Sequence, residues 1–177
     1  SVNVPDADVY IALTFDDGPT GAIDGYSNGL TAYLLDGLKE RGAHATFFMV
    51  GDRVNMFSST LPRLVSEGHE LGNHTMTHPM QHLTGLQKDA IKKEITSASD
   101  TIKEKAGQPP TVLRPVGGGV NSDVKAVAKE LGLPIINWNV DTQDWKNRNA
   151  QSVHDAIVNA ADGSVVLMHD LYPTSVE

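Results

Sequence analysis

Short apolar segments alternate with longer amphipathic segments along most of the chain. The short segments are bounded by glycine, proline or polar clusters, which is typical of β-strands. In the longer segments apolar residues recur at helical spacing, as Leu30, Leu34 and Leu38 do, which predicts helices with one buried face. Strands are predicted at residues 9–15, 45–50, 70–73, 112–114, 135–140 and 165–169, and helices at residues 27–41, 58–67, 84–106, 122–131 and 150–160.

The predicted strands and helices alternate with short connections between them. This order predicts a parallel sheet with crossover helices, which could form either an open sheet or a barrel. Gly42 follows the first predicted helix and Gly107 follows the third, and glycine at these places is a helix stop signal. No low-complexity linker or internal repeat divides the chain, so we expect residues 1–177 to form a single α/β domain.

The charge and the cysteine content exclude several classes of protein. With 22 acidic and 14 basic residues, the formal net charge is −8. This charge argues against nucleic acids and anionic membranes as partners, but it says little about a neutral polymer. The chain has no cysteine, which excludes a disulfide framework and a cysteine–zinc site. No run approaches the roughly 18 apolar residues of a membrane span, so we expect no membrane insertion within this segment.

Ionisable side chains gather where the predicted strands end. In parallel α/β folds the carboxyl ends of the strands meet at one edge, and that edge is where chemistry takes place. A structural protein would have little reason to place so many ionisable groups there. The residues at or just past these strand ends are Asp16, Asp17, His74, Arg114, Asp141 and His169.

Residues 14–19, with the sequence TFDDGP, place two adjacent carboxylates at the end of the first predicted strand. Because successive side chains of a strand point to opposite faces, Asp16 and Asp17 can do different work: one can hold a metal while the other takes a proton. The alternative is purely local, since aspartate also satisfies backbone N–H groups in turns. The adjacent spacing does not match an Asp-x-Asp phosphatase loop or an EF-hand.

Residues 74–78, with the sequence HTMTH, form a second metal-type cluster. Two imidazoles and one carboxylate leave an open position on zinc, as catalytic sites do. Pro79 disfavours helical geometry at His78, so a loop or a single turn is expected. The glutamate of a His-Glu-x-x-His protease is missing. Two surface histidines capping a turn would be the simpler interpretation, but the carboxylate pair Asp16 and Asp17 favours a mononuclear metallohydrolase.

Two further strand ends contribute acids, a histidine and an indole. Asp144 and Trp145 follow the strand at residues 135–140, and His169 ends the last one. His169 is a candidate proton carrier because histidine titrates near neutrality, although it could equally be a structural histidine. Asp144 and Trp145 could simply be a helix-start acid beside a packing aromatic. The other histidines lack a partner pattern and are interpreted as structural or surface residues; they are His44, His69, His82 and His154.

Taken in order, these motifs resemble those of the polysaccharide deacetylases of carbohydrate esterase family 4, the NodB homology domain. Residues 14–19 resemble the first motif of that family, residues 74–78 the second, residues 141–145 the fourth and residues 167–169 the fifth. The resemblance implies a distorted (β/α) barrel of seven or eight strands. Because the chain stops at Glu177, we expect this barrel to lack its last helix and strand.

The third motif departs from the family pattern. The family usually shows Arg-Pro-Pro, an aromatic residue and Gly, whereas residues 114–118 read RPVGG. The resemblance implies a backbone N–H at the aromatic position that holds the oxyanion, and Gly117 can still supply it. The substrate wall on that side is expected to change, and three consecutive glycines are expected to loosen the loop.

The resemblance also assigns roles at the site. Asp17, His74 and His78 would bind one divalent ion, with zinc expected and cobalt or nickel as alternatives. Asp16 would be the general base, oriented and kept ionised by Arg114. His169 would protonate the departing amine, and Asp144 would favour its imidazolium form. Trp145 and Leu167 would wall the pocket for the acetyl methyl group, beside the Gly117 N–H.

The implied substrate is a polymer containing N-acetylglucosamine. Residues 144–149, with the sequence DWKNRN, look like the corresponding stretch of bacterial peptidoglycan N-acetylglucosamine deacetylases, so peptidoglycan is favoured. An acetylxylan esterase and a chitin or chitooligosaccharide deacetylase are alternatives on the same site. A catalytically weak carbohydrate-binding module is an alternative of another class. We expect a monomer that is extracellular or associated with the cell wall.

Overall fold

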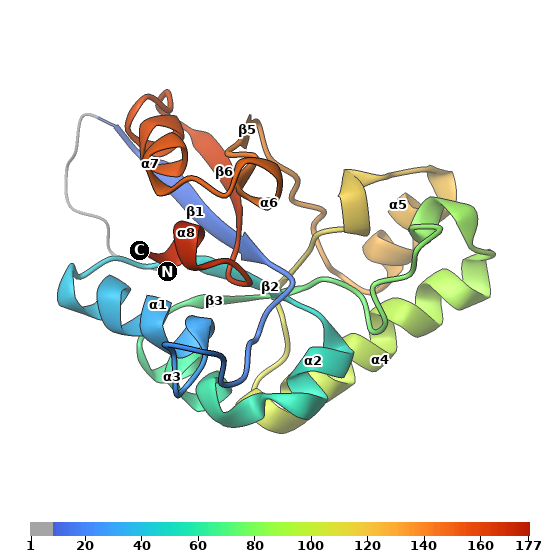
Figure 1. Ribbon diagram of the computed structural model, residues 1–177. Coiled ribbons are helices and arrows are strands. Elements are labelled where there is room, and N and C mark those ends of the chain that lie inside the picture. Colours follow the sequence, from blue (N-terminus) through green and yellow to red (C-terminus); the bar gives the residue numbers. More distant parts are fainter. Residues whose placement is uncertain (1–8) are drawn as a thin grey trace.

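The computed structural model describes residues 9–177, so the first eight residues of the expected single domain lie outside it. A parallel six-stranded sheet in the order β4-β3-β2-β1-β6-β5 forms its centre (Figure 1). The predicted parallel α/β fold is therefore confirmed. The strands are β1 (Ile11–Asp16), β2 (Thr46–Met49), β3 (Glu70–Asn73), β4 (Val112–Leu113), β5 (Val140–Asp141) and β6 (Ser164–His169).

The pairing register brings the carboxyl ends of the strands to one edge. Asp16 at the end of β1 is level with His169 at the end of β6. On the other side, Asp16 pairs with Phe48 of β2, and the end of β2 is level with Asn73 of β3. Residues that follow these strands must therefore leave the sheet at the same edge, as the sequence predicted.

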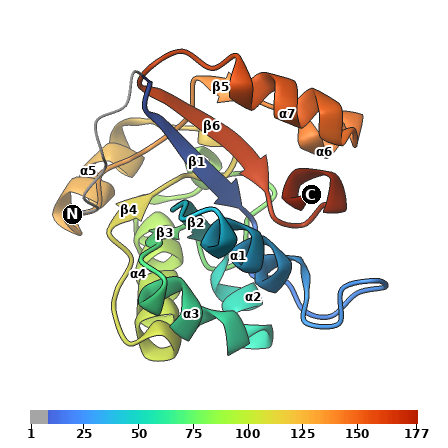
Figure 2. The ribbon, with the colours of Figure 1, turned by 90° about the vertical axis from the view of Figure 1, so that its left-hand side faces the viewer.

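Helices surround the sheet, with α1, α3 and α4 on one side of it and α7 on the other (Figures 1 and 2). Three short helices, α2, α6 and α8, were not predicted because four to six residues are too few to show a helical period. The helices are α1 (Leu30–Glu40), α2 (Gly51–Met56), α3 (Leu61–Ser66), α4 (Lys88–Ala106), α5 (Ser122–Glu130), α6 (Asp144–Asn147), α7 (Ala150–Val158) and α8 (Pro173–Val176), with 3₁₀ turns η1 (Ser58–Thr60), η2 (Leu83–Gly85) and η3 (Val116–Gly118).

Local signals in the sequence set several helix ends. Gly107 takes the left-handed conformation at the end of α4, with φ of 81°, and donates its N–H to the carbonyl of Lys103. Asn121 and Asn149 begin α5 and α7, and each side chain accepts a backbone N–H of the first turn. None of the helices within residues 9–177 combines the length and the apolar character that crossing a membrane requires.

Two apolar clusters hold the layers together. The larger one packs leucines of α1 and α3 against β2, as with Leu35, Leu64 and Phe47, which are almost completely buried. The second packs α4 and α5 together through residues such as Ile95 and Val124. Each such side chain contributes about 1.5–3 kcal/mol on burial, so the helical stripes read from the sequence are the main source of stability.

The strand predicted at residues 135–140 is wrong over most of its length. Ile135 makes one bridge to Leu113 beside β4, and only Val140 enters β5. Between them the carbonyls of Ile136 and Asn137 accept hydrogen bonds from the side chain of Arg114, so they are not available to a strand ladder. The segment runs from one edge of the sheet to the other, as in a distorted barrel.

Candidate active site

The end of β1 holds the two adjacent carboxylates. Asp16 is the last residue of the strand and is almost completely buried. Asp17 follows with φ of 74°, a left-handed conformation that few residues other than glycine adopt. Its N–H donates to the carbonyl of Phe48 in β2, and the carbonyl of Gly18 accepts the N–H of Val50. These bonds to the neighbouring strand fix the direction of both carboxylates.

The loop that bears His74 and His78 follows β3 directly. Asn73, the last residue of β3, accepts the N–H of Thr75 through its side chain. Glu94 of α4 accepts the N–H groups of Met76 and Thr77, at 3.0 and 2.9 Å. The segment is therefore a loop held by side chains, as Pro79 led us to expect.

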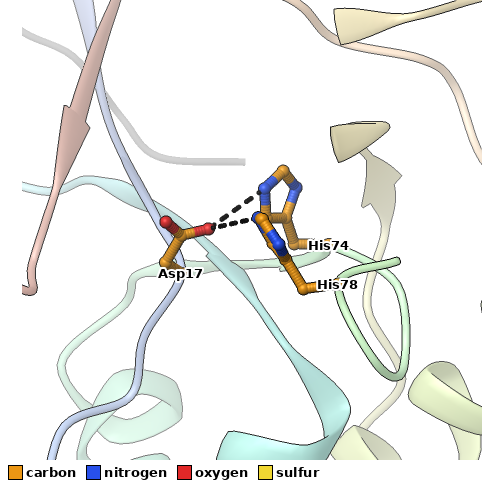
Figure 3. A group of neighbouring side chains, drawn as sticks. All are labelled: Asp17, His74 and His78. Carbon is orange, nitrogen blue, oxygen red and sulfur yellow. Dashed lines mark ion pairs between the residues drawn. The ribbon is translucent and has the colours of Figure 1, made fainter. Parts of the chain in front are cut away.

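The structure brings Asp17, His74 and His78 together (Figure 3). Oδ1 of Asp17 lies 3.3 Å from Nε2 of His74 and 3.2 Å from Nε2 of His78. His74 is buried, whereas the side chain of His78 is 42% exposed. One candidate ligand atom from each residue lies within 4.8 Å of the other two.

The chemistry of these atoms fits a cation. Nδ1 of His74 is 2.7 Å from the carbonyl oxygen of Arg114, and a carbonyl can only accept. Nδ1 therefore bears the proton of a neutral ring, and the lone pair of Nε2 faces Asp17. Oδ1 of Asp17 is itself buried and makes no hydrogen bond within residues 9–177. A buried carboxylate oxygen between two imidazole nitrogens is a fitting place for a divalent metal.

The charges of this cluster are strongly coupled. Burial raises the pKa of Asp17, but the facing imidazoles of His74 and His78 outweigh it and leave the pKa well below its usual range. Burial lowers the pKa of His74, but the charge of Asp16 and the contact with Asp17 outweigh it and raise the pKa. The negative charge that favours a proton on His74 would equally favour a cation.

Asp16 is held by a buried arginine. Oδ1 of Asp16 accepts a hydrogen bond of 2.7 Å from Nη1 of Arg114, whose side chain is completely buried. The same guanidinium donates to Thr14 and to two carbonyls of the crossing segment, and it lies over the ring of Phe48 at 4.0 Å. Burial lowers the pKa of Arg114, which still remains a cation at all ordinary pH values. The other oxygen of Asp16, Oδ2, lies 3.7 Å from Nε2 of His74.

His169 is held by a buried carboxylate. Asp144 accepts four hydrogen bonds: from the ring of His169 at 2.8 Å, the N–H of His169, the N–H of Trp145 and the hydroxyl of Ser175. Burial raises the pKa of Asp144, but these bonds outweigh it and lower the pKa. Burial lowers the pKa of His169, but the bond to Asp144 outweighs it and raises the pKa. Nε2 of His169 faces Asp17 at 4.0 Å.

The three predicted substrate residues lie on elements that also carry site residues, or close to them in the sequence. Leu167 is buried in β6, two residues before His169. Trp145 lies next to Asp144 at the start of α6 and is half exposed. Gly117 lies exposed in η3 with φ of 64°, three residues after Arg114. Their predicted roles in the acetyl pocket and at the oxyanion remain predictions.

The sequence analysis did not predict several residues that support the site. Glu94 and Asn73 accept hydrogen bonds from the loop that bears the histidines. Ser175 donates a hydrogen bond to Asp144, and the buried carboxylate of Asp170 packs against Gly18. Each contact except that of Asn73 joins segments 17 or more residues apart, so no local spacing reveals it.

The backbone gives a clearer signal, because positions in unusual conformations cluster at functional sites. Among residues 9–177 the non-glycine positions with positive φ are Asp17, Thr75, His78, His82, Gln143 and Arg148, all in the loops that bear or flank the site.

Comparison with known proteins identifies the family. Residues 3–136 match the sequence model of the family described as Polysaccharide deacetylase. The chain belongs to this family. The resemblance drawn from the motifs is therefore confirmed.

Two of the curated relatives are named as peptidoglycan deacetylases. The chain is 41% identical over 168 residues to peptidoglycan-N-acetylmuramic acid deacetylase PdaC of Bacillus subtilis, covering 94% of this chain and 33% of that protein. It is 42% identical over 166 residues to peptidoglycan-N-acetylglucosamine deacetylase PgdA of Listeria monocytogenes, covering 93% and 33%. The chain thus spans about a third of the length of these curated relatives.

Solved structures of the family share the fold. The structure of PdaC from Bacillus subtilis superposes with a TM-score of 0.84 at 40% identity, covering 95% of this chain and 78% of that one. A family 4 carbohydrate esterase from Streptomyces lividans, in complex with acetate, superposes with a TM-score of 0.87 at 32% identity, covering 97% and 84%. The expected NodB-like fold is thereby confirmed.

Proposed function

We propose that this chain is a metal-dependent hydrolase that removes N-acetyl groups from N-acetylglucosamine residues of a cell-wall polysaccharide. One observation above all supports this: the cluster of Asp17, His74 and His78 has a carboxylate, Asp16, on one side and an imidazole, His169, on the other. A cation site between a candidate base and a candidate acid is the arrangement that amide hydrolysis needs.

Asp17, His74 and His78 would hold the metal, and we propose zinc. The Asp17–His74 and Asp17–His78 separations of 3.3 and 3.2 Å are short enough for all three side chains to hold one ion, and imidazole and carboxylate are donors that zinc accepts. Cobalt and nickel are alternatives, because imidazole and carboxylate accept either ion. When bound, the metal supplies Lewis-acid polarisation of the acetyl carbonyl and a lowered pKa for water.

Asp16 is proposed to accept the proton of the attacking water. Its Oδ1 is occupied by Arg114, so Oδ2, the oxygen that faces the metal cluster, is free to act as base. Arg114 orients the carboxylate and stabilises its charge. The water oxygen then bonds to the carbonyl carbon, and the N–H of Gly117 is the proposed donor to the resulting oxyanion.

His169 is proposed to complete the reaction as the acid. As the bond between the carbonyl carbon and nitrogen breaks, the imidazolium gives its proton to the departing nitrogen, so that acetate and a free amine are released. Asp144 supports this role, because its bond to Nδ1 raises the pKa of His169 and leaves Nε2 directed at the cluster. Trp145 and Leu167 would wall the space for the acetyl methyl group.

Peptidoglycan is the favoured substrate, because the two curated relatives above are named as peptidoglycan deacetylases. A chitooligosaccharide deacetylase of Rhizobium leguminosarum, 36% identical, keeps chitin oligomers as an alternative, and an acetyl xylan esterase of Clostridium thermocellum keeps acetylxylan. We also propose a monomer, with a single catalytic domain, that works outside the cell or in the cell wall. The weak carbohydrate-binding module is less favoured, because base, acid and ligand set are all present.

The test combines metal analysis with acetate release from peptidoglycan, chitin oligomers and acetylxylan. The wild-type protein should bind one equivalent of metal and release acetate from at least one polymer. His74→Ala should lose both metal and activity. Asp16→Asn should keep the metal and lose roughly two to four orders of magnitude in kcat. Asp100→Asn, a change at an exposed position of α4, is the control and should behave as wild type.

Full activity in Asp16→Asn would contradict the assignment of the base. Polysaccharide binding without acetate release, even with added zinc or cobalt, would favour the carbohydrate-binding module.

A further inference from the structure

The imidazole of His82 covers the bare backbone of Gly117. A Cβ atom at Gly117 would lie 2.6 Å from Cε1 and 2.9 Å from Nδ1 of His82, which is closer than such atoms can approach. The ring therefore fills the space into which a side chain at position 117 would project. Both residues are exposed, so the contact lies at the surface of the molecule.

The contact joins two loops that begin at the candidate metal site. His82 is four residues after His78, and Gly117 is three residues after Arg114. The carbonyl oxygen of Arg114 is 2.7 Å from Nδ1 of His74. The loop after His78 and the loop after Arg114 thus meet where His82 touches Gly117. The N–H of Gly117 itself is the one that we propose to face the oxyanion.

The backbone holds His82 in an unusual conformation. Its φ of 56° and ψ of 169° are rarely adopted by residues other than glycine, and such strain persists only where neighbours enforce it. Here the N–H of His82 donates to the carbonyl of Pro79, and the carbonyl of His82 accepts the N–H of Gly85. These bonds hold the backbone from which the ring reaches Gly117.

The ring of His82 has unused polar atoms. Neither ring nitrogen makes a hydrogen bond or ion pair with any of residues 9–177. The neighbouring glycines are covered in a similar way, Gly118 by Trp138 and Gly119 by Thr84. Side chains of other segments therefore give the glycine loop its walls, and among these His82 offers a flat ring with both a donor and an acceptor for sugar hydroxyls.

We propose that His82 is a specificity-determining residue whose imidazole forms the wall of the sugar-binding surface beside Gly117 and contacts the N-acetylglucosamine unit that loses its acetyl group. The proposal rests on the proposed function. It replaces the sequence-based interpretation of His82 as a structural or surface residue. Because the contact is made with bound substrate before and during the reaction, its loss should raise KM more than it lowers kcat.

The test measures acetate release from peptidoglycan and from fully N-acetylated chitotetraose. His82→Ala should raise KM for chitotetraose about three- to tenfold, with kcat within about twofold of wild type. His82→Phe, which restores the flat ring without its two nitrogens, should recover only part of the loss, with KM between those of His82→Ala and wild type. His154→Ala removes an exposed histidine from α7 and should change neither constant. Because His82 is exposed, the melting temperature should stay the same in all variants.

A double-mutant cycle isolates the contact with Gly117. Gly117→Ala should impair activity in the wild-type background, because the new methyl group displaces the His82 ring, and should impair it less in the His82→Ala background. Unchanged KM in His82→Ala, or no coupling between the two positions, would overturn the proposal while leaving the deacetylase function intact. A wild-type protein that releases no acetate from either substrate would overturn both.

Discussion

The two sides of the candidate site each contain a buried ion pair, but the fixed partner has opposite charge. On the side of the base, Arg114 is fixed: it is completely buried, and hydrogen bonds and the Phe48 ring leave it one orientation. On the side of the acid, Asp144 is fixed: it is also completely buried and accepts four hydrogen bonds. In each pair the other partner, Asp16 or His169, faces the candidate metal site and is the residue proposed to move a proton.

This difference shows how one edge of a sheet can hold an acid and a base side by side. Arg114, a permanent cation, donates a hydrogen bond to Asp16, whereas the carboxylate of Asp144 favours the imidazolium form of His169. Neither pair adds much to stability by itself, because a buried ion pair must offset the desolvation of both charges. What the pairs provide is a cation beside the proposed base and an anion beside the proposed acid. Removing each fixed partner in turn tests this arrangement.

The largest effect is expected from Arg114→Met. The substitution keeps much of the side-chain volume but leaves Asp16 buried without its partner, which costs about 3–5 kcal/mol of unfolding free energy. Acetate release should fall to background, because the base loses its orientation. Urea denaturation and acetate assays measure the two effects. Arg63→Met removes an arginine whose ion pair with Glu67 is partly exposed, and it should cost less than about 1 kcal/mol. An equal loss in both variants would contradict the special place of Arg114.

The next effect is expected from Asp144→Asn. A neutral amide no longer favours the imidazolium, so kcat should fall by about a hundredfold or more, and the bound metal should remain. The pKa of His169 is raised above 6.5 in the wild type, so the acid form persists to higher pH. Without Asp144 the alkaline limb of the pH–rate profile should move to lower pH. Equal metal content in the two proteins would show that the comparison isolates the carboxylate.

The same pair gives stability a pH dependence with a definite sign. The pKa of His169 is raised in the folded state, so His169 stabilises the fold below its unfolded pKa of 6.5, and this contribution is lost as pH rises through the folded pKa.

Asp155→Asn is the matched control for Asp144→Asn, because Asp155 also pairs with a histidine, His154, but at an exposed position. It should leave the rate profile unchanged. A profile that shifts equally in both variants would contradict a specific role for Asp144.

How far the sequence could predict the molecule depends on the range of the interactions. Strand β3 and the bulk of α5 and α7 followed from local apolar patterns, and so did the position of Asp16 and Asp17 at a strand end. The segment at residues 135–140 did not, because a guanidinium from a distant loop takes its carbonyls. The motif residues could be named because each motif is short. Their supports could not be named, because α4 and α8 reach the site only after folding.

Asp170 extends the comparison to a buried carboxylate that forms no ion pair within residues 9–177. It accepts a hydrogen bond from Thr31 at one oxygen, while the other makes none within the part of the chain that the structure describes. Burial raises the pKa of Asp170 to about 6. The native state therefore holds a proton between pH 3.8 and about 6 that the unfolded chain releases, and stability falls as pH rises through this range.

Asp170→Asn should remove this pH dependence. The unfolding free energy of the variant should rise relative to wild type between pH 4 and pH 7, by at most about 3 kcal/mol. Urea denaturation at several pH values measures the difference. Asp100→Asn, on the exposed side of α4, should show a constant offset over the same range. A constant offset for Asp170→Asn as well would show that the carboxyl is ionised throughout.

The smallest effect is expected from Glu94→Gln, which weakens the support of the proposed metal ligands without changing any of them. Glu94 accepts three hydrogen bonds from Met76 and Thr77, which lie between His74 and His78, and an amide keeps only one strong acceptor oxygen. Metal affinity should fall by about tenfold, as is usual when a partner of a ligand is changed. Titration with a competing chelator measures it. Glu104→Gln changes an exposed glutamate of the same helix and should leave the affinity unchanged. Equal affinities in both variants would mean that the ends of the loop alone, at β3 and at Pro79, hold the two imidazoles in place.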